Sequence, residues 1–289
     1  MDILSTSGWD DYALLDSGEG YRLERFGDYI LVRPDPQVIW QKKLPQEKWD
    51  KADAVFTRIK EDKGNWKYKK QPPHNWNISW NELTFQIRMS PFKHTGVFPE
   101  QVLHWNWMQE KIKQSHRPVN ILNLFGYTGI ASLACASAGA KVTHVDASKP
   151  TIAWARDNQR LSNLEDKSIR WIMDDAMKFC QRELRREIKY DGIIMDPPVY
   201  GHGPTGQVWK FNEHFPQLVQ VCKQLFSTHP LFFIVNAYAI SSSAFTIKNV
   251  LEDIIDTSHK SVSVGELVLE EQTGKRFVST GLFGRISFV

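Results

Sequence analysis

The pattern of apolar and polar residues changes near residue 118 and separates two parts of the chain. Before that point, short segments of alternating polarity stand between turn residues, as in β-strands joined by tight connections. A helical period occurs there only over residues 45–59. We predict a small β-rich domain over residues 1–90, a candidate for binding RNA or another substrate. Its expected strands are residues 12–15, 21–26 and 29–33 and an alternating stretch over 76–89, with a turn over 16–20.

Beyond residue 118, short apolar runs alternate with amphipathic stretches. Regular alternation of strand and helix implies parallel strands joined by crossovers. We therefore expect an α/β fold over residues 91–289, with a doubly wound, mostly parallel seven-stranded sheet. The last two strands have no long helix between them and should form an antiparallel hairpin. The predicted strands are 119–125, 141–146, 169–173, 191–195, 231–236, 262–269 and 277–289, and the predicted helices 128–138, 148–162, 175–188, 212–228 and 243–257.

Composition excludes several classes of protein. With 42% hydrophobic and 24% charged residues, the chain is not intrinsically disordered. Cys135, Cys180 and Cys222 lie far apart, which excludes a disulfide scaffold and a cysteine-built zinc site and indicates a reducing compartment. No apolar run reaches the length of a membrane span, and the first residues lack an export signal. We expect a cytoplasmic protein with no metal, because the histidines show no ligand spacing. The sequence indicates no oligomeric state.

Charge adds one local feature. The net charge of +3 is too small to indicate nucleic-acid binding by itself. Between Arg58 and Lys70, however, six residues are basic and two acidic, with Trp66 and Tyr68 among them. This segment is either a solvated hairpin or loop, or a strip that neutralises phosphates and stacks bases. The tryptophans singled out as candidates for base stacking are Trp66, Trp76 and Trp209.

Ligands of open α/β sheets bind beyond the carboxyl ends of the strands, near the point where the strand order reverses. The first unusual strand end is residues 121–129, where an apolar strand runs into a loop containing Gly126 and Gly129. Glycines let the backbone approach a ligand, and the helix start that follows offers N–H groups. The Gly-x-x-Gly spacing matches neither a dinucleotide fingerprint nor a Walker loop. By itself, this loop fits a tight turn equally well.

Acidic residues end the next two strands. Asp146 stands about twenty positions after the glycine loop, where a carboxylate can accept from both hydroxyls of a ribose. Alternatively, Asp146 and Ser148 cap the helix that follows. Either Asp174 or Asp175 could accept from an adenine amino group, or both could be helix caps.

A fourth strand ends in Asp196-Pro197-Pro198. The prolines remove two backbone donors and fix the direction of the chain, which leaves carbonyl oxygens beside a carboxylate. Such a cluster of acceptors suits the edge of a neutral base better than an anion. The alternative is a rigid loop with a surface acid.

Together, the segments 123–129, 145–148, 155–158, 174–175 and 196–198 resemble class I S-adenosylmethionine-dependent methyltransferases, and among them the bacterial large-subunit rRNA methyltransferase group. The resemblance covers about residues 85 to 289. It implies a Rossmann-like methyltransferase fold in which the glycine loop holds the methionine moiety, Asp146 the ribose and Asp175 the adenine. A segment over 91–101 resembles the stretch that closes over the cofactor in these relatives. The cofactor-binding residues implied are Lys93, Thr95, Gly96, Phe98, Gln101, Phe125, Gly126, Tyr127, Thr128, Gly129, Asp146, Ala147, Ser148, Asn158, Asp174, Asp175, Ala176 and Asp196.

The chain departs from this group in lacking the usual appended RNA-binding domain and a cysteine after the fourth or fifth strand. Methylation of pyrimidine carbon 5 needs a thiolate that first adds to the ring, whereas the three cysteines fall in predicted helices and should be buried structural thiols. A nitrogen acceptor needs no covalent step. We therefore hypothesise methylation of a base nitrogen of RNA, with rRNA as the substrate that the resemblance implies.

The expected catalytic residues are Asp196, Pro197, Pro198 and Tyr200, although Val199 intervenes where related amino methyltransferases have Asp-Pro-Pro-Tyr. The expected substrate-binding residues are His202, Trp209 and Lys210, and a structural role for His202 is the alternative. Three other functions stay open: a methyltransferase acting on a protein or small molecule, a nicotinamide-dependent oxidoreductase, and a catalytically silent RNA-binding module.

Overall fold

The computed structural model describes residues 1–60, 63–238, 240, 242–256 and 261–288. The chain divides into two compact units. The larger unit comprises Met1–Leu4, Leu103–Leu267 and Thr280–Val289, and the smaller unit comprises Ser5–Val102 and Val268–Ser279. The sequence-based boundary near residue 90 did not assign residues 268–279 to the N-terminal part.

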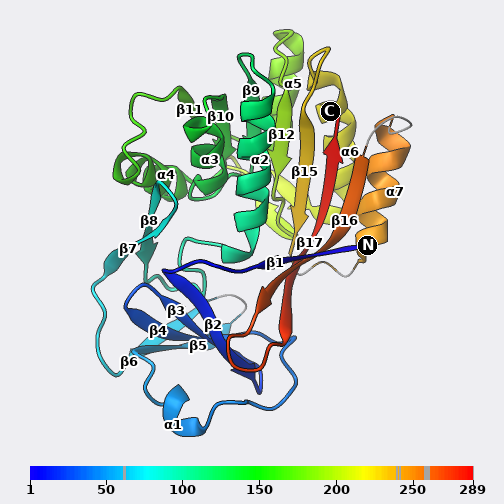
Figure 1. The fold of residues 1–289 in the computed structure, drawn as a ribbon. Helices are drawn as coiled ribbons and strands as arrows, with labels where there is room; N and C mark the ends of the chain where they lie inside the picture. Colours follow the sequence, from blue (N-terminus) through cyan, green and yellow to red (C-terminus); the bar gives the residue numbers. More distant parts are fainter. Residues whose placement is uncertain (61–62, 239, 241, 257–260, 289) are drawn as a thin grey trace. The chain divides into compact units, whose positions relative to one another are not determined.

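The larger unit is built on an eight-stranded sheet (Figure 1). From β9, the chain adds β10 and β11 in parallel on one side, then returns to place β12 and β15 in parallel on the other. The strand order therefore reverses between β9 and β12. This confirms the doubly wound, mostly parallel sheet, with β1 as an eighth strand that the sequence did not predict. The order is β1 (Asp2–Thr6), β16 (Ser261–Glu270), β17 (Phe277–Ser287), β15 (Phe232–Ala237), β12 (Gly192–Met195), β9 (Asn120–Leu124), β10 (Lys141–Asp146), β11 (Ile169–Met173).

The predicted strands and helices of this unit are confirmed to within three residues, except that the predicted ends at 257 and 289 lie outside the described residues. β16 and β17 are neighbours joined by a short connection, as the hairpin prediction required. The helix α2 was not predicted, because buried polar residues such as His104 and Gln109 interrupt its apolar stripe. The helices are α2 (Val102–Gln114), α3 (Ile130–Ser137), α4 (Lys149–Leu161), α5 (Ala176–Arg185), α6 (Phe211–Leu225) and α7 (Ala244–Ile254).

One face of the sheet packs against α5, α6 and α7 around a buried core that includes Phe179, Leu218 and Phe233. Full burial of a side chain of this size stabilises the fold by about 1.5–3 kcal/mol. The three cysteines are free and buried in α3, α5 and α6, as expected. None of the helices in the described ranges combines the length and apolar character that crossing a membrane requires.

The smaller unit contains a five-stranded sheet and a separate two-stranded one, which confirms the β-rich prediction. The expected strands over residues 21–26 and 29–33 are present as β3 and β4, which pair as an antiparallel hairpin. The five-stranded sheet has the order β2 (Tyr12–Gly18), β3 (Tyr21–Phe26), β4 (Tyr29–Pro34), β5 (Ala54–Lys60), β6 (Lys63–Tyr68), and the second sheet pairs β7 (Asn75–Trp80) with β8 (Leu83–Arg88).

One prediction for this unit is wrong, and another is confirmed in a different form. The helix expected over 45–59 is only the short α1 (Gln46–Trp49), because Ala54 and Phe56 alternate as buried positions of β5. The alternating stretch over 76–89 is two strands, which turn at Asn81 with a φ of 49°. Asparagine tolerates this left-handed conformation better than most residues do.

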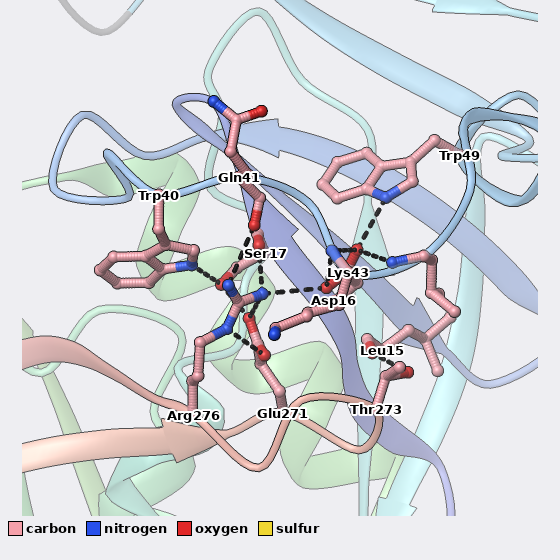
Figure 2. A network of polar contacts seen from close by, with 11 residues as sticks. Leu15, Asp16, Ser17, Trp40, Gln41, Lys43, Trp49, Glu271, Thr273 and Arg276 are labelled. Carbon is pink, nitrogen blue, oxygen red and sulfur yellow. Dashed lines mark hydrogen bonds and ion pairs between the residues drawn. The ribbon is translucent and has the colours of Figure 1, made fainter.

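The turn expected over residues 16–20 is present only at Glu19 and Gly20, because β2 continues to Gly18 and buries Asp16 completely. The Asp16 carboxylate accepts hydrogen bonds from the backbone N–H groups of Lys43 and Leu44 and from the indole of Trp49 (Figure 2). It also forms an ion pair of 3.2 Å with Arg276. These partners satisfy a buried charge that would otherwise be costly.

Arg276 holds residues 268–279 to the rest of the smaller unit. Its guanidinium bonds Glu271 and donates to the carbonyl oxygens of Ser17 and Gln41 at 2.8 and 2.9 Å (Figure 2). Glu271 is fully buried and also accepts from the Ser17 hydroxyl. A segment from the end of the chain thus completes the polar interior of an N-terminal sheet.

Candidate active site

The carboxyl ends of β9, β10 and β12 meet at one edge of the larger sheet. Leu124 pairs with Val145 on one side and with Met195 on the other. The backbone N–H of Gly126 donates to the Val145 carbonyl at 3.1 Å, and that of Asp196 to the Leu124 carbonyl at 3.3 Å. The glycine loop and the Asp-Pro-Pro segment are therefore adjacent, as the predicted site requires.

The glycine loop has a strained backbone. Phe125, Tyr127 and Gly129 all have left-handed conformations, with φ values of 56°, 50° and 82°. At a residue with a side chain, this conformation costs about 1–3 kcal/mol and persists only where the surroundings enforce it. Asn158 of α4 provides part of that support, because its buried amide donates to the Thr128 carbonyl at 2.9 Å. The structure thus gives Asn158 a role in positioning the loop.

Gly126 has no space for a side chain. A Cβ atom there would lie 2.5 Å from Nδ1 of His144, in the strand below. His144 is fully buried, its Nδ1 lies 3.0 Å from the Ser132 hydroxyl, and Ser132 accepts from Asn123 at 2.9 Å. Burial lowers the pKa of His144 to about 3, so the ring is neutral. The sequence analysis did not predict this network. The polar residue His144 within an apolar strand was the signal that could have indicated it.

Asp146 connects the glycine loop to the start of α4. One carboxylate oxygen accepts from the Tyr127 N–H at 2.9 Å and the other from the Ser148 N–H at 2.8 Å. Burial raises the pKa of Asp146, and these two donors partly offset that effect. Each oxygen has capacity for a further hydrogen bond. The helix cap is Ser148, which accepts from the Thr151 N–H, and Ala147 lies half-buried between the two.

Two acidic residues follow the end of β11, and both already have hydrogen-bond partners. Asp175 caps α5 by accepting from the Lys178 N–H at 2.9 Å, which confirms the capping interpretation for this residue. Asp174 forms an ion pair with Arg182 and accepts from the Asp175 N–H. Ala176 begins the helix and is buried. An adenine contact at this strand end stays a prediction.

Beyond Asp196, the chain forms a small hairpin of β13 (Tyr200–His202) and β14 (Val208–Lys210), which the sequence analysis missed. Pro197 is buried and Pro198 exposed. Trp209 is only 6% exposed, and its indole N–H donates to the Pro198 carbonyl at 2.7 Å. This placement gives Trp209 a role in holding the Asp-Pro-Pro segment, and its contact with a substrate stays a prediction.

The exposed face of this hairpin carries the other predicted substrate residues. Tyr200 is 56% exposed, and its ring lies edge-on to the exposed ring of His202, with centroids 5.2 Å apart. Lys210 is exposed and bonded to Glu213. A Cβ atom on Gly203 would lie 3.1 Å from an Asp175 carboxylate oxygen, so the hairpin tip lies beside the start of α5.

The remaining predicted cofactor residues belong to the smaller unit. Thr95 is fully buried, its carbonyl accepts from the Arg88 N–H, and its hydroxyl has no hydrogen-bond partner among the described residues. Gly96 has a φ of 103°. A contact between these residues and a bound cofactor stays a prediction. The residues concerned are Lys93, Thr95, Gly96, Phe98 and Gln101.

The residues at this edge fit a cofactor made of a nucleoside and an amino acid. The helix α3 begins at Gly129 without a side-chain cap, which leaves backbone N–H groups for a carboxylate. Asp146 lies at the end of β10, the strand that follows the glycine loop. In doubly wound folds, an acidic residue at this position accepts hydrogen bonds from a ribose. Within the part of the chain that the structure describes, no group of three or more acidic, histidine or cysteine side chains is placed to hold a metal.

A doubly wound sheet with a glycine loop at the reversal point and an acid on the next strand defines a Rossmann-like cofactor-binding enzyme. The chain belongs to the S-adenosylmethionine-dependent methyltransferase family, whose model matches residues 50–246. It is therefore an enzyme with S-adenosylmethionine as its cofactor, and the oxidoreductase interpretation is excluded.

Comparison with solved structures and curated proteins agrees with this assignment. The chain is 42% identical to a SAM-dependent methyltransferase from Agrobacterium tumefaciens, with a TM-score of 0.97 and coverage of 100% of this chain and 94% of that one. A putative SAM-dependent methyltransferase from Streptococcus mutans shares the fold at 19% identity, with a TM-score of 0.75 over 97% of this chain and 76% of that one.

Among curated proteins, the chain is similar to ribosomal RNA large subunit methyltransferase K/L. The Shewanella loihica protein is 28% identical over 81% of this chain and 35% of its own length. The Shewanella woodyi protein is 27% identical over 84% of this chain and 37% of its own length. The chain thus spans about a third of the length of these relatives.

Proposed function

We propose that the protein methylates a base nitrogen of RNA, with rRNA as the substrate. The observation that carries this proposal is the position of Asp196-Pro197-Pro198, a cluster of hydrogen-bond acceptors directly beside the glycine loop. When bound, S-adenosylmethionine supplies an electrophilic methyl group on a sulfonium. A neutral N–H acceptor facing that methyl group is what the carboxylate and carbonyl oxygens of this segment suit best.

The cofactor roles in this proposal follow the strand ends. The glycine loop and the uncapped start of α3 hold the methionine moiety, Asp146 accepts from the ribose hydroxyls, and Asp175 accepts from the adenine. A contact of residues 93–101 with the cofactor stays a prediction from the resemblance. The neutral His144 beneath Gly126 keeps the loop in its strained shape and places no charge beside the sulfonium.

The acceptor base would be held by the Asp-Pro-Pro segment and its hairpin. Asp196 and the Pro197 carbonyl accept from the base, and Tyr200 stacks on it. The bound cofactor would supply its methyl group to the acceptor nitrogen, and Asp196 would take up the proton that this nitrogen releases. His202 and Lys210 lie where they could contact the same substrate, because they share this hairpin.

The cysteines support a nitrogen rather than a carbon acceptor. All three are buried within helices, and burial raises the pKa of Cys135 far above its ordinary range. A buried neutral thiol is a poor nucleophile. The covalent route to pyrimidine carbon 5 therefore has no exposed thiol among these three side chains.

RNA is favoured over other acceptors by two observations. The curated relatives act on ribosomal RNA by name. The basic segment over 58–70 is the β5–β6 hairpin, with exposed Arg58, Lys63 and Lys67 and a Tyr68 side chain 45% exposed. Part of that segment, residues 61–62 and the Lys60 side chain, lies outside the described residues. Binding of RNA by this hairpin, and a cytoplasmic location, belong to the proposal.

Mass spectrometry of rRNA nucleosides from cells with and without the gene tests this function. A methylated base that disappears with the gene, and returns with the wild-type chain, supports it and identifies the position. An unchanged set of RNA nucleosides contradicts it and favours a protein or small-molecule acceptor.

Complementation with Asp196→Ala tests the site. We expect no methylation, while calorimetry still detects S-adenosylmethionine binding. Asp166→Ala, which removes an exposed carboxylate elsewhere on the same unit, is the matched control and should restore methylation. Normal turnover by Asp196→Ala would refute the role of this carboxylate.

A further inference from the structure

A groove of about 420 Å³ lies between α4 and β11 on the larger unit. β11 is the last strand in the sheet order, so this groove follows the outer edge of the sheet. The proposed mechanism uses none of its side chains. They are Lys149, Ile152, Ala153, Arg156, Asp157, Arg160, Trp171 and Met173.

The rim of the groove is positively charged. Lys149, Arg156 and Arg160 project from α4, and among the residues that the structure describes only Arg160 has an acidic partner, Asp157. In the described ranges, Lys149 and Arg156 make no hydrogen bond or ion pair through their exposed side chains. The three cations span twelve helical residues, from Lys149 to Arg160, or about 16 Å. The positive end of the α4 dipole, at Lys149, adds to the attraction for an anion.

The floor of the groove is apolar and partly aromatic. Met173 is 51% exposed, which is unusual for a strand residue of this size. Trp171 is half-buried, and its indole N–H donates to the side-chain oxygen of Gln159 at 3.0 Å. This bond fixes the plane of the indole. An aromatic floor beneath unpaired cations is the combination that binds single-stranded nucleic acid, since bases stack while phosphates meet the cations.

We infer that this groove binds a single-stranded segment of the RNA substrate. The inference rests on the proposed function, because it assumes an RNA acceptor. It adds a second contact site, outside the acceptor pocket and on the methyltransferase unit itself. An acidic peptide would match the cationic rim, but the indole and thioether floor favours a nucleobase.

The floor also contacts the cofactor loop. A Cβ atom on Gly129 would lie 3.0 Å from the Trp171 ring, and the His144 ring lies 4.7 Å from it, measured between centroids. The same indole thus lines the groove and supports the strained loop. Binding of RNA in the groove should change the affinity for S-adenosylmethionine, and by linkage the cofactor should change RNA affinity by the same factor.

Fluorescence anisotropy with the full chain tests the inference. The probe is a labelled single-stranded RNA of about 12 nucleotides, which is within the range of single-strand binding sites. Arg156→Glu should weaken binding about tenfold and reduce its salt dependence. The matched control is Arg185→Glu on α5, an exposed arginine with no partner among the described residues, and it should stay within about twofold of wild type. Equal affinities for the two variants would overturn the inference.

A second variant tests whether the interior of the groove must be accessible to RNA. Ala153→Glu places a bulky anion in the groove on a helix that tolerates glutamate, and it should weaken RNA binding as much as Arg156→Glu does. Unchanged RNA affinity overturns the inference. So does tighter binding of a glutamate-rich peptide than of the RNA probe.

These assays do not need methyl transfer. If rRNA is methylated normally while Arg156→Glu binds the probe like wild type, the groove is refuted and the proposed function stands. If RNA binds in the groove and is never methylated, the proposed function is refuted.

Discussion

The indole N–H of Trp209 donates a 2.7 Å hydrogen bond to the carbonyl oxygen of Pro198. The same ring packs against the Phe125 ring, with centroids 4.9 Å apart. Trp209 therefore links the segment proposed to hold the acceptor base to the loop proposed to hold the methionine moiety. In-line transfer needs these two parts at a fixed separation, because small misplacements of reacting atoms cost large factors in rate.

Trp209→Phe should separate catalysis from cofactor binding. Phenylalanine retains most of the ring contact with Phe125 and loses the N–H, and loss of the hydrogen bond to the Pro198 carbonyl costs about 0.5–1.5 kcal/mol. We expect kcat to fall about tenfold while the Kd for S-adenosylmethionine stays within about threefold. Steady-state methyl transfer and calorimetry measure the two quantities. Equal losses in both would show that Trp209 supports only the cofactor loop.

Gly126→Ala should weaken cofactor binding without unfolding the protein. The added methyl group would overlap the buried His144 ring, so the glycine loop must move. We expect S-adenosylmethionine affinity to fall at least tenfold in calorimetry, with an unchanged circular dichroism spectrum. Gly139→Ala is the control, because its Cβ meets no atom within 4 Å and only its left-handed backbone is strained. It should cost about 1 kcal/mol of stability and leave the affinity intact.

Asp146→Asn should weaken cofactor binding through the ribose. The amide retains the size of the carboxylate but has only one acceptor oxygen, so it cannot serve both backbone N–H groups and a diol. We expect the Kd for S-adenosylmethionine to rise by one to two orders of magnitude. The effect on S-adenosylhomocysteine should be equal, since both carry the same ribose. Unchanged affinity would show that the ribose is bound by another residue.

The buried histidines should make the protein acid-sensitive. The pKa of His144 is about 3 in the folded chain because of burial, against about 6.5 when unfolded. Between these values the unfolded state binds more protons, so stability is full above pH 6.5 and falls as the pH drops towards 3. His104 acts in the same direction, since burial and then Arg285 lower its pKa to about 3. Each such histidine contributes a slope of up to about 1.4 kcal/mol per pH unit.

Urea unfolding of His144→Asn from pH 7 to pH 4.5 checks this prediction. The variant should lose less stability over that interval than the wild type, whatever its stability at pH 7. His229→Asn, which changes an exposed ring, should follow the wild-type curve. A His144→Asn curve parallel to the wild type would show that this ring takes up no proton on unfolding.

Arg276→Gln should destabilise the smaller unit. The substitution removes the cation that faces two fully buried carboxylates, Asp16 and Glu271. Loss of one partner from a buried ion pair costs about 3–5 kcal/mol. Thermal unfolding should show this loss, and Lys275→Gln, next in the chain and 73% exposed at its side chain, should show almost none. Similar melting curves would mean that the backbone donors and the Trp49 indole satisfy Asp16 without Arg276.

The sequence predicted the larger unit well because its strands are buried on both faces and its helices are amphipathic, which are local signals. It placed Gly126, Asp146 and Asp196 at neighbouring strand ends because the α/β topology dictates where strand ends meet. The failures are positions whose environment is decided far away in the chain. Asp16 resembles a turn residue until Arg276 is known to face it, 260 residues later.

The same limit applies at the active site. Trp209 is an aromatic residue in a polar loop, and such a residue predicts a stacking surface. Its burial depends on the β13–β14 hairpin, whose strands have only three residues each and give no periodic signal. His144 and Asn123 were readable as polar residues in apolar strands, but their partner Ser132 could be identified only from the packing of α3 on the sheet.

The place of residues 268–279 in the smaller unit has a consequence for biosynthesis. The ribosome releases the N-terminal strands some 166 residues before Val268, the difference between positions 102 and 268. At 5–20 residues per second, this interval lasts roughly ten to thirty seconds. During that time Arg276 has not been synthesised and cannot pair with Asp16. The N-terminal sheet of the nascent chain therefore stays incomplete, with Asp16 solvated or bound by a chaperone, until residues 268–279 have been translated.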